Sequence, residues 1–162
     1  MSLGTFAPGY YGLTYDGDDP GLVHGVRRLR RRYRTHPIQA DKFGDTTIDG
    51  VYRGGDVFLS MVFKEWNATV RAMLWPFDAD FGDLGAIGDL VTDYCLPMVL
   101  TAQAASPAAA AGPATITANL AILAPENDVE ILLGNEQRDV PVLIQLYPYE
   151  VSTGRFVHFV PT

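Results

Sequence analysis

The 162-residue chain has three histidines and one cysteine. His24, His36 and His158 lie in separate segments without HxH or HxxxH spacing, and Cys95 is the single cysteine. A zinc site needs several such ligands at close spacing, and one cysteine cannot form an internal disulfide. The sequence therefore predicts no metal site and no structural disulfide.

Two short segments resemble ligand-binding loops only superficially. A calcium loop at Asp16–Gly21 would need an oxygen ligand where Pro20 stands, and the closing glutamate is absent. Gly82, Gly85 and Gly88 recur at every third position but lack the βαβ unit that surrounds a dinucleotide fingerprint. We interpret both segments as turns or loops. Because GxSxG, P-loop and HExxH motifs are also absent, we expect no enzyme activity, no cofactor and no bound metal.

The strongest chemical signal is a cluster of arginines. Six of the twelve basic residues fall between positions 27 and 34, whereas the rest of the chain has six basic residues against nineteen acidic ones. As a strand, Val26–Thr35 would alternate its side chains between two faces. One face would hold Arg28, Arg30, Arg32 and Arg34, and the other Arg27, Leu29, Arg31 and Tyr33. A helix would spread this charge around its circumference with no apolar stripe, so we expect a strand.

Three interpretations of this cationic strand stay open. Charge on a solvated edge strand blocks unwanted pairing between sheet edges. A phosphate-binding surface would bind nucleic acid with steep salt dependence, with some stacking support from Tyr33. The interpretation that we favour is an interface between identical subunits, at which arginine forks meet carboxylates of a neighbour. The candidate carboxylates are Asp16, Asp18, Asp19, Asp78, Asp80 and Asp83.

Short strands and turns are predicted for most of the chain. Thr46–Arg53 and Asp56–Phe63 are rich in strand-forming residues and flank Gly54 and Gly55, which predicts a β-hairpin. The remaining predicted strands are Tyr10–Tyr15, Tyr94–Ala102, Ala114–Leu123, Val129–Leu133, Val140–Tyr147 and Phe156–Val160. Such spacing favours a β-sandwich or barrel.

One α-helix interrupts the strands. Apolar residues between Trp66 and Phe77 recur at helical spacing, Asn67 is a suitable N-cap, and Pro76 ends the helix. We therefore expect a single, mainly β domain over residues 1–162. Flexible segments are expected at the N-terminal arm (about 1–9) and in loops near 43–50, 78–90 and 103–113.

The ends and apolar runs of the chain predict a soluble protein. No apolar stretch approaches the roughly 20 residues that cross a bilayer. The N-terminus lacks the basic and apolar regions of a secretory signal. No membrane association is therefore expected.

The chain also resembles a known family, the tail tube (major tail) proteins of long-tailed bacteriophages and related phage-tail-like particles. The similarity is one of overall pattern and runs through most of the chain. It is seen in Gly9–Gly17, Tyr52–Phe58, Trp75–Phe77, Ala121–Asn127, Arg138–Pro141 and Leu146–Tyr149.

This resemblance implies a β-sandwich or barrel of the phage tail tube type, flanked by a helix. Its subunits would form hexameric rings that stack into a tube, with DNA passing through the lumen without specific binding. Further implied partners are a tape-measure protein, a tail terminator and baseplate or tail-tip proteins. The implied location is the virion tail, after assembly in the bacterial host cytoplasm. The alternatives are another virion connector, such as a tail terminator or head-completion ring, and a nucleic-acid-binding module.

Overall fold

The computed structural model describes residues 11–21, 23–39, 47–77, 87–102, 113–128 and 139–162 of the chain. Over these ranges the chain is mainly β with one α-helix, as predicted. The elements are β1 (Tyr11–Tyr15), β2 (Val23–Gln39), β3 (Thr47–Phe63), α1 (Ala68–Leu74), the 3₁₀ helix η2 (Val91–Tyr94), β4 (Leu96–Ala102), β5 (Thr115–Leu123), β6 (Val140–Leu146), β7 (Tyr149–Ser152), β8 (Arg155–Val157) and β9 (Val160–Pro161).

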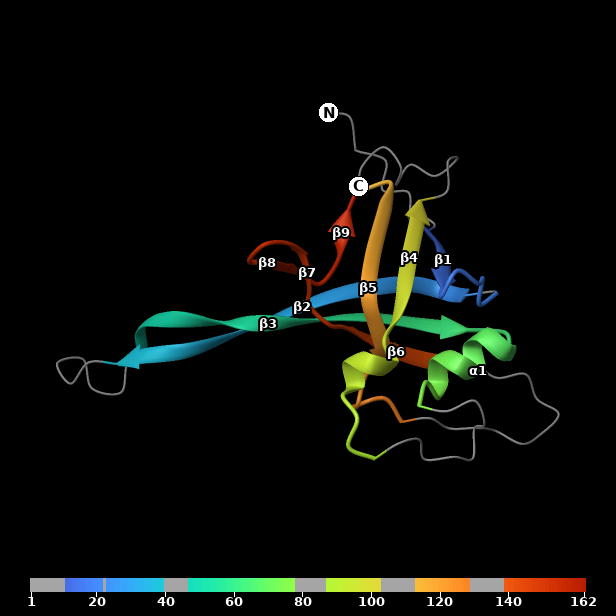
Figure 1. Cartoon of the computed structure of the whole chain (residues 1–162), viewed down its shortest axis with the longest axis horizontal. Coiled ribbons are helices and arrows are strands. Elements are labelled where there is room, and N and C mark those ends of the chain that lie inside the picture. Colours follow the sequence, from blue (N-terminus) through green and yellow to red (C-terminus); the bar gives the residue numbers. More distant parts are fainter. Residues whose placement is uncertain (1–10, 22, 40–46, 78–86, 103–112, 129–138) are drawn as a thin grey trace.

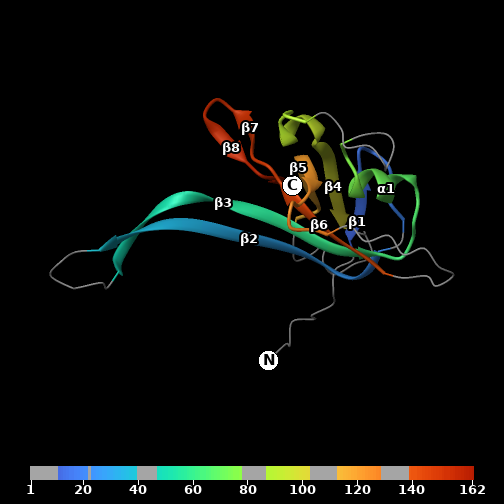
Figure 2. The same cartoon turned by 90° about the horizontal axis from the view of Figure 1, so that it is seen from below.

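Most of these strands form one curled antiparallel sheet. Its order is β1-β4-β5-β6-β3-β2, with β9 added to β5, while β7 and β8 form a separate hairpin. Consecutive strands β1 and β2 therefore lie at opposite edges of the sheet (Figure 1). Figure 2 shows the long β2–β3 hairpin running across one side of the molecule, with β4, β5 and α1 on the other.

The core lies on one face of this sheet. Every second residue of β3 from Val57 to Phe63 is buried, as the two-residue period of a strand requires. Opposite them in β6, Val142, Ile144 and Leu146 are also buried. The core residues from α1 are Val70, Met73 and Leu74. The helix thus closes one side of the core.

The predicted helix and its N-cap are confirmed. The Asn67 side-chain oxygen accepts a hydrogen bond from the Val70 amide (2.9 Å), and its amide nitrogen donates to the Pro20 carbonyl (2.9 Å). The helix ends at Leu74, with Trp75 as its C-cap immediately before Pro76. A single side chain therefore starts α1 and ties it to the turn between β1 and β2.

The predicted hairpin within residues 46–63 is wrong. β3 is one continuous strand whose hairpin partner is β2, so residues 47–50 are strand and not loop. Arg53 and Gly54 form a β-bulge, because these two β3 residues stand opposite Arg34 alone, whereas Gly55 pairs with Tyr33. Gly54 has a φ of +90°, and a Cβ on Gly55 would lie 2.6 Å from the Arg32 carbonyl oxygen. Gly54 therefore suits the left-handed backbone, and Gly55 allows β2 to approach β3 closely. Neither glycine marks a reversal of the chain.

Several predicted boundaries shift by a few residues. The strand expected from Tyr94 begins at Leu96, because η2 occupies Val91–Tyr94. The strand expected over Phe156–Val160 is divided between β8 and β9. The strand predicted at 129–133 lies outside the described residues, as do the N-terminal arm and the loop positions 43–46, 78–86 and 103–112.

Candidate interaction surface on the β2–β3 hairpin

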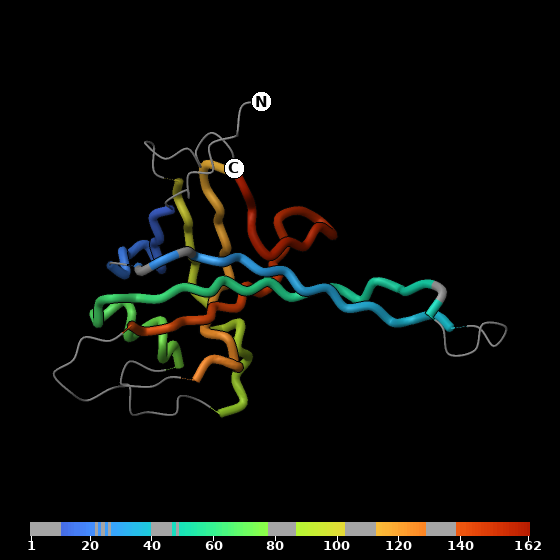
Figure 3. The backbone as a smooth tube through the Cα atoms, turned by 180° about the vertical axis from the view of Figure 1, so that it is seen from behind, coloured from blue at the N-terminus to red at the C-terminus, as the bar shows by residue number. Residues whose placement is uncertain are grey.

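The β2–β3 hairpin is much longer than the sheet that supports it. Both strands have 17 residues, yet β3 pairs with β6 only from Val57 to Phe63. The remaining part, Arg32–Gln39 with Thr47–Asp56, extends beyond the sheet (Figures 1 and 3). We call this part of the hairpin the arm, which is not to be confused with the N-terminal arm of residues 1–9. At about 3.3 Å per residue, its β2 strand is about 23 Å long.

The predicted alternation of the arginines is confirmed from Arg28 to Arg32. Arg28, Arg30 and Arg32 are exposed and pair with Ser60, Phe58 and Asp56, on the face of β3 that points away from the core. We call this the outer face. On the core side, Leu29 pairs with the buried Leu59 and packs against the core.

The other three arginines, Arg27, Arg31 and Arg34, each have different surroundings. Arg34 donates a hydrogen bond to an Asp56 carboxylate oxygen at 2.5 Å, and its side chain is 67% exposed. An exposed pair of this kind contributes about 0–1 kcal/mol. The Arg31 guanidinium lies over the Phe159 ring, 5.6 Å from its centre, which is a cation–π distance. Arg27 is partly buried.

The structure does not bring the predicted carboxylates to the arm within one chain. Asp16, Asp18 and Asp19 are exposed in the turn after β1, at the end of β2 that is farther from the arm. There the Asp19 side chain accepts a hydrogen bond from the Gly21 amide (2.9 Å). The other three candidates, Asp78, Asp80 and Asp83, lie outside the described residues. Pairing of any of these carboxylates with arginines of a neighbour stays a prediction.

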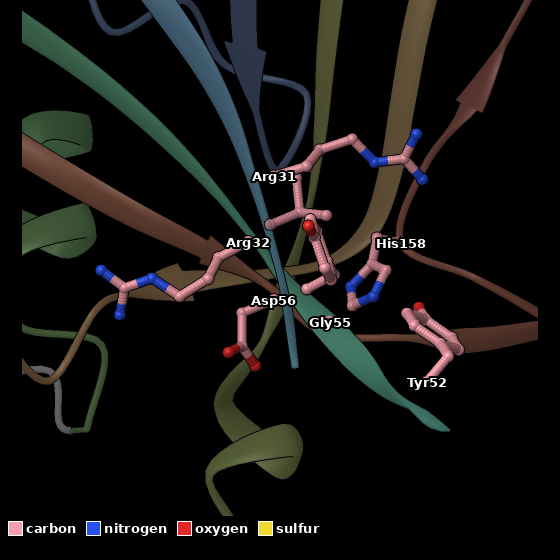
Figure 4. Close-up of a pocket in the computed structure, with 8 residues that line it drawn as sticks. Arg31, Arg32, Tyr52, Gly55, Asp56 and His158 are labelled. Carbon is pink, nitrogen blue, oxygen red and sulfur yellow. The ribbon is translucent and has the colours of Figure 1, made fainter. Parts of the chain in front are cut away.

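A pocket of about 240 Å³ lies at the base of the arm (Figure 4). Two of its aromatic side chains are largely exposed, Tyr33 at 73% and Tyr52 at 67%. His158 reaches it from the segment after β8, and its Nδ1 lies 2.8 Å from the Leu146 carbonyl oxygen. Because a carbonyl only accepts, Nδ1 is the donor. The full lining is Arg31, Arg32, Tyr33, Tyr52, Gly55, Asp56, Val57 and His158.

The sequence did not predict this pocket or the ion pair of Asp56 with Arg34. The two glycines before Asp56 were the available signal, since paired glycines inside a strand-forming run are typical of a bulge as well as of a turn. The approach of His158 to Tyr52 had no local signal, because the two residues are far apart in the chain.

The charge of the hairpin is opposite to that of the remaining chain. Strands β2 and β3 contain seven arginines and two aspartates, a formal charge of +5. Because the whole chain carries −7, the remainder carries −12. Potentials of opposite sign on separate surfaces favour association between copies.

The described residues show no sign of an activated nucleophile or a metal centre. Burial, followed by the nearby Asp93 carboxylate, raises the pKa of the Cys95 thiol to about 11, so it stays protonated at neutral pH and is a poor nucleophile. Within the described ranges, no three His, Cys, Asp or Glu side chains are grouped to hold a metal ion. The helices in this part of the chain are all too short or too polar to cross a membrane.

Comparison with known proteins leaves the family open. The chain matches no protein-family model and no curated protein. The similarity to tail tube proteins and the virion role therefore stay predictions, and the geometry of the hairpin is the main structural guide to function.

Proposed function

We propose that this chain is a structural virion protein that self-assembles into stacked hexameric rings, forming the tail tube through which phage DNA passes. The observation that carries the proposal is the arm, a two-stranded extension without a core of its own. The mainly β fold with one helix supports the proposal at the level of fold class, and the β-sandwich or barrel of the tail tube type is part of the proposal.

The arm has the physical character of a docking element. A two-stranded hairpin alone is marginally stable in water, because it buries little apolar surface. This one nevertheless exposes Tyr33, Val51 and Tyr52 by 73%, 54% and 67% of their areas. Covering these side chains with a neighbouring subunit would remove apolar area from water, at about 25 cal/mol per Å². Contacts with a neighbouring subunit would therefore stabilise the arm, whose aromatic side chains stay exposed in the described part of the chain.

The sheet edges support assembly through different surfaces of one chain. β1 and β2 lie at opposite edges of the sheet, and an unpaired edge is a template for pairing with another chain. Contacts between two different surfaces close into a ring when the rotation allows. A second head-to-tail contact along the ring axis does not close and gives a stack.

The acidic remainder of the chain suits a conduit for DNA. A lumen lined by carboxylates would repel phosphates and let DNA slide without adhering. The tape-measure protein, tail terminator and baseplate or tail-tip proteins belong to this proposal as partners. Another virion connector would share the arm but form single rings.

One observation favours a nucleic-acid-binding module as the second candidate. The exposed row Arg28, Arg30 and Arg32 lies on the same hairpin as the exposed rings of Tyr33 and Tyr52. Arginines that bind phosphates together with aromatic stacking are typical of single-strand binding. Such a module would bind DNA as a monomer with steep salt dependence, whereas a tube subunit would not.

Negative-stain electron microscopy with sedimentation velocity, over a range of protein and salt concentrations, separates the candidates. Stacked hollow rings are expected, and single unstacked rings would favour a connector. A monomer that retards DNA at low salt in a gel-shift assay would refute the tube and support the binding module.

A further inference from the structure

We propose that the arm binds the 87–94 segment, Ile87 to Tyr94, of a second copy of the chain. The inference rests on the proposed self-assembly and names the two surfaces that meet. The pocket beside Tyr33 and Tyr52 receives an aliphatic side chain of this segment, and the segment's carboxylates meet arginines of the arm.

The 87–94 segment carries apolar side chains that are exposed, together with acidic ones. Ile87 is 90% exposed and Leu90 68% exposed, and Val91 is 38% exposed beside them in sequence. Asp89 and Asp93 add two negative charges. Single exposed aliphatic residues are ordinary, whereas exposed apolar side chains that gather on one surface are typical of interaction sites.

The segment is held in a fixed shape. The Tyr94 hydroxyl donates a hydrogen bond to an Asp89 carboxylate oxygen at 2.9 Å, and the Asp93 amide donates to the Leu90 carbonyl at 2.9 Å. The Tyr94 ring also packs edge-on against Phe77, with their centres 5.5 Å apart. Because these contacts exist before binding, little ordering entropy is lost when a partner docks.

The pocket at the base of the arm matches one side chain better than a free ligand. Its volume of about 240 Å³ is below the roughly 300–1,000 Å³ of small-molecule sites. Exposed Tyr33 and Tyr52 rings supply apolar walls of the kind that anchor an interface. Arg31 and Arg32 also line it, and a guanidinium carries five donors for carboxylates such as Asp89.

The two surfaces are separate within one molecule, so a second copy is the natural occupant. In Figure 1 the segment, yellow-green below the sheet, lies apart from the arm at the left. The acidic turn at Asp16–Asp19 is the weaker candidate, because no exposed aliphatic side chain accompanies its charges among the described residues 11–21. Joining two different surfaces gives a head-to-tail contact, which leaves one arm and one segment open for further subunits.

Paired variants test this contact. The arm variant is Tyr33→Ser with Tyr52→Ser, and the segment variant is Ile87→Ser with Leu90→Ser. The control variant, Trp66→Ser, removes a large apolar side chain between β3 and α1 that is 47% exposed and belongs neither to the pocket lining nor to the 87–94 segment. All these side chains are exposed, so circular dichroism should show folded proteins. If the arm variant is not folded, Tyr52→Ser alone replaces it.

The association constant, measured by sedimentation velocity, should fall at least about tenfold in the arm variant and in the segment variant, because each loses side chains that anchor the interface. The control variant should associate like the wild type. Mixing the arm and segment variants should restore a defined complex, because one intact arm and one intact segment remain in each pair.

The outcomes separate this inference from the proposed tube. If the wild type forms tubes and the segment variant forms them equally well, the contact is refuted and the tube stands. If arm and segment variants lose association but the wild type forms no hollow rings, the contact stands and the tube fails. A wild type that is monomeric throughout refutes both.

Discussion

Replacing Arg30 with glutamate reverses one charge on the outer face of β2 without touching the core. Arg30 is exposed and stands opposite Phe58, so the new carboxylate does not face another acid. Arg32 is a poorer choice, because it pairs with Asp56, and two like charges across strands cost about 0.2–1 kcal/mol. Arg30→Glu should therefore change the free energy of unfolding by about 0.5 kcal/mol or less.

The expected effect on assembly is larger. Two unit charges about 4 Å apart in water interact with about 1 kcal/mol, so turning attraction into repulsion costs about 2 kcal/mol. This corresponds to a roughly 30-fold weaker association constant. Higher salt should reduce the effect, because the Debye length falls to about 3 Å near 1 M.

Arg155→Glu is the matched control. Arg155 is exposed on β8 and does not line the pocket, and either substitution changes the net charge from −7 to −9. Sedimentation velocity at low and high salt, with circular dichroism melts, compares the two. If Arg30→Glu assembles like Arg155→Glu at low salt, the outer arginines are only a solvated edge, and the interface reasoning is wrong.

Three further changes test the fold beneath this surface. Asn67→Ala should destabilise the protein by about 1 kcal/mol through loss of the N-cap, and a loss below about 0.3 kcal/mol in urea titration would contradict the capping role. Leu59→Ala should cost about 2–5 kcal/mol in the same assay because Leu59 is buried in the sheet centre; Val51→Ala, exposed on the same strand, is the control and should cost far less. Burial raises the pKa of Tyr15 far above its usual value, so the unfolded chain releases this proton first and stability should fall above about pH 10, by up to about 1.4 kcal/mol per pH unit. Tyr15→Phe should remove that part of the slope, and an unchanged slope would refute the assignment.

Local patterns in the sequence predicted local structure well. Apolar spacing between Trp66 and Phe77, with Asn67 and Pro76 at the ends, located the helix because each signal acts within a turn or two of the chain. The alternation around Arg30 likewise located the cationic strand and its exposed face. Both predictions depended on neighbouring residues alone.

Strand pairing could not be predicted in the same way. Gly54 and Gly55 fit a tight turn locally, and only the pairing of Tyr33 with Gly55 and of Thr35 with Tyr52 identifies a bulge at Arg53 and Gly54. That pairing also makes the arm, because it sets β3 beside β2 over its whole length. The pocket between Tyr52 and His158 depends on the path of β7 and β8 back to the hairpin, which is a tertiary property. The register of the strands and the curvature of the sheet depend on the packing of the whole core, so short sequence motifs do not encode them.

The charge distribution favours one of the two leading interpretations of the arm. A monomer that binds DNA through a hairpin of charge +5 must bring phosphates near a remainder of charge −12, which opposes binding at low salt, where screening is weakest. A second copy of the same chain offers that acidic remainder as the attracting surface instead. Its 87–94 segment supplies aliphatic side chains as well, which the phosphate backbone of a nucleic acid lacks. The pairing of charge with apolar surface on both elements therefore favours assembly over nucleic-acid binding.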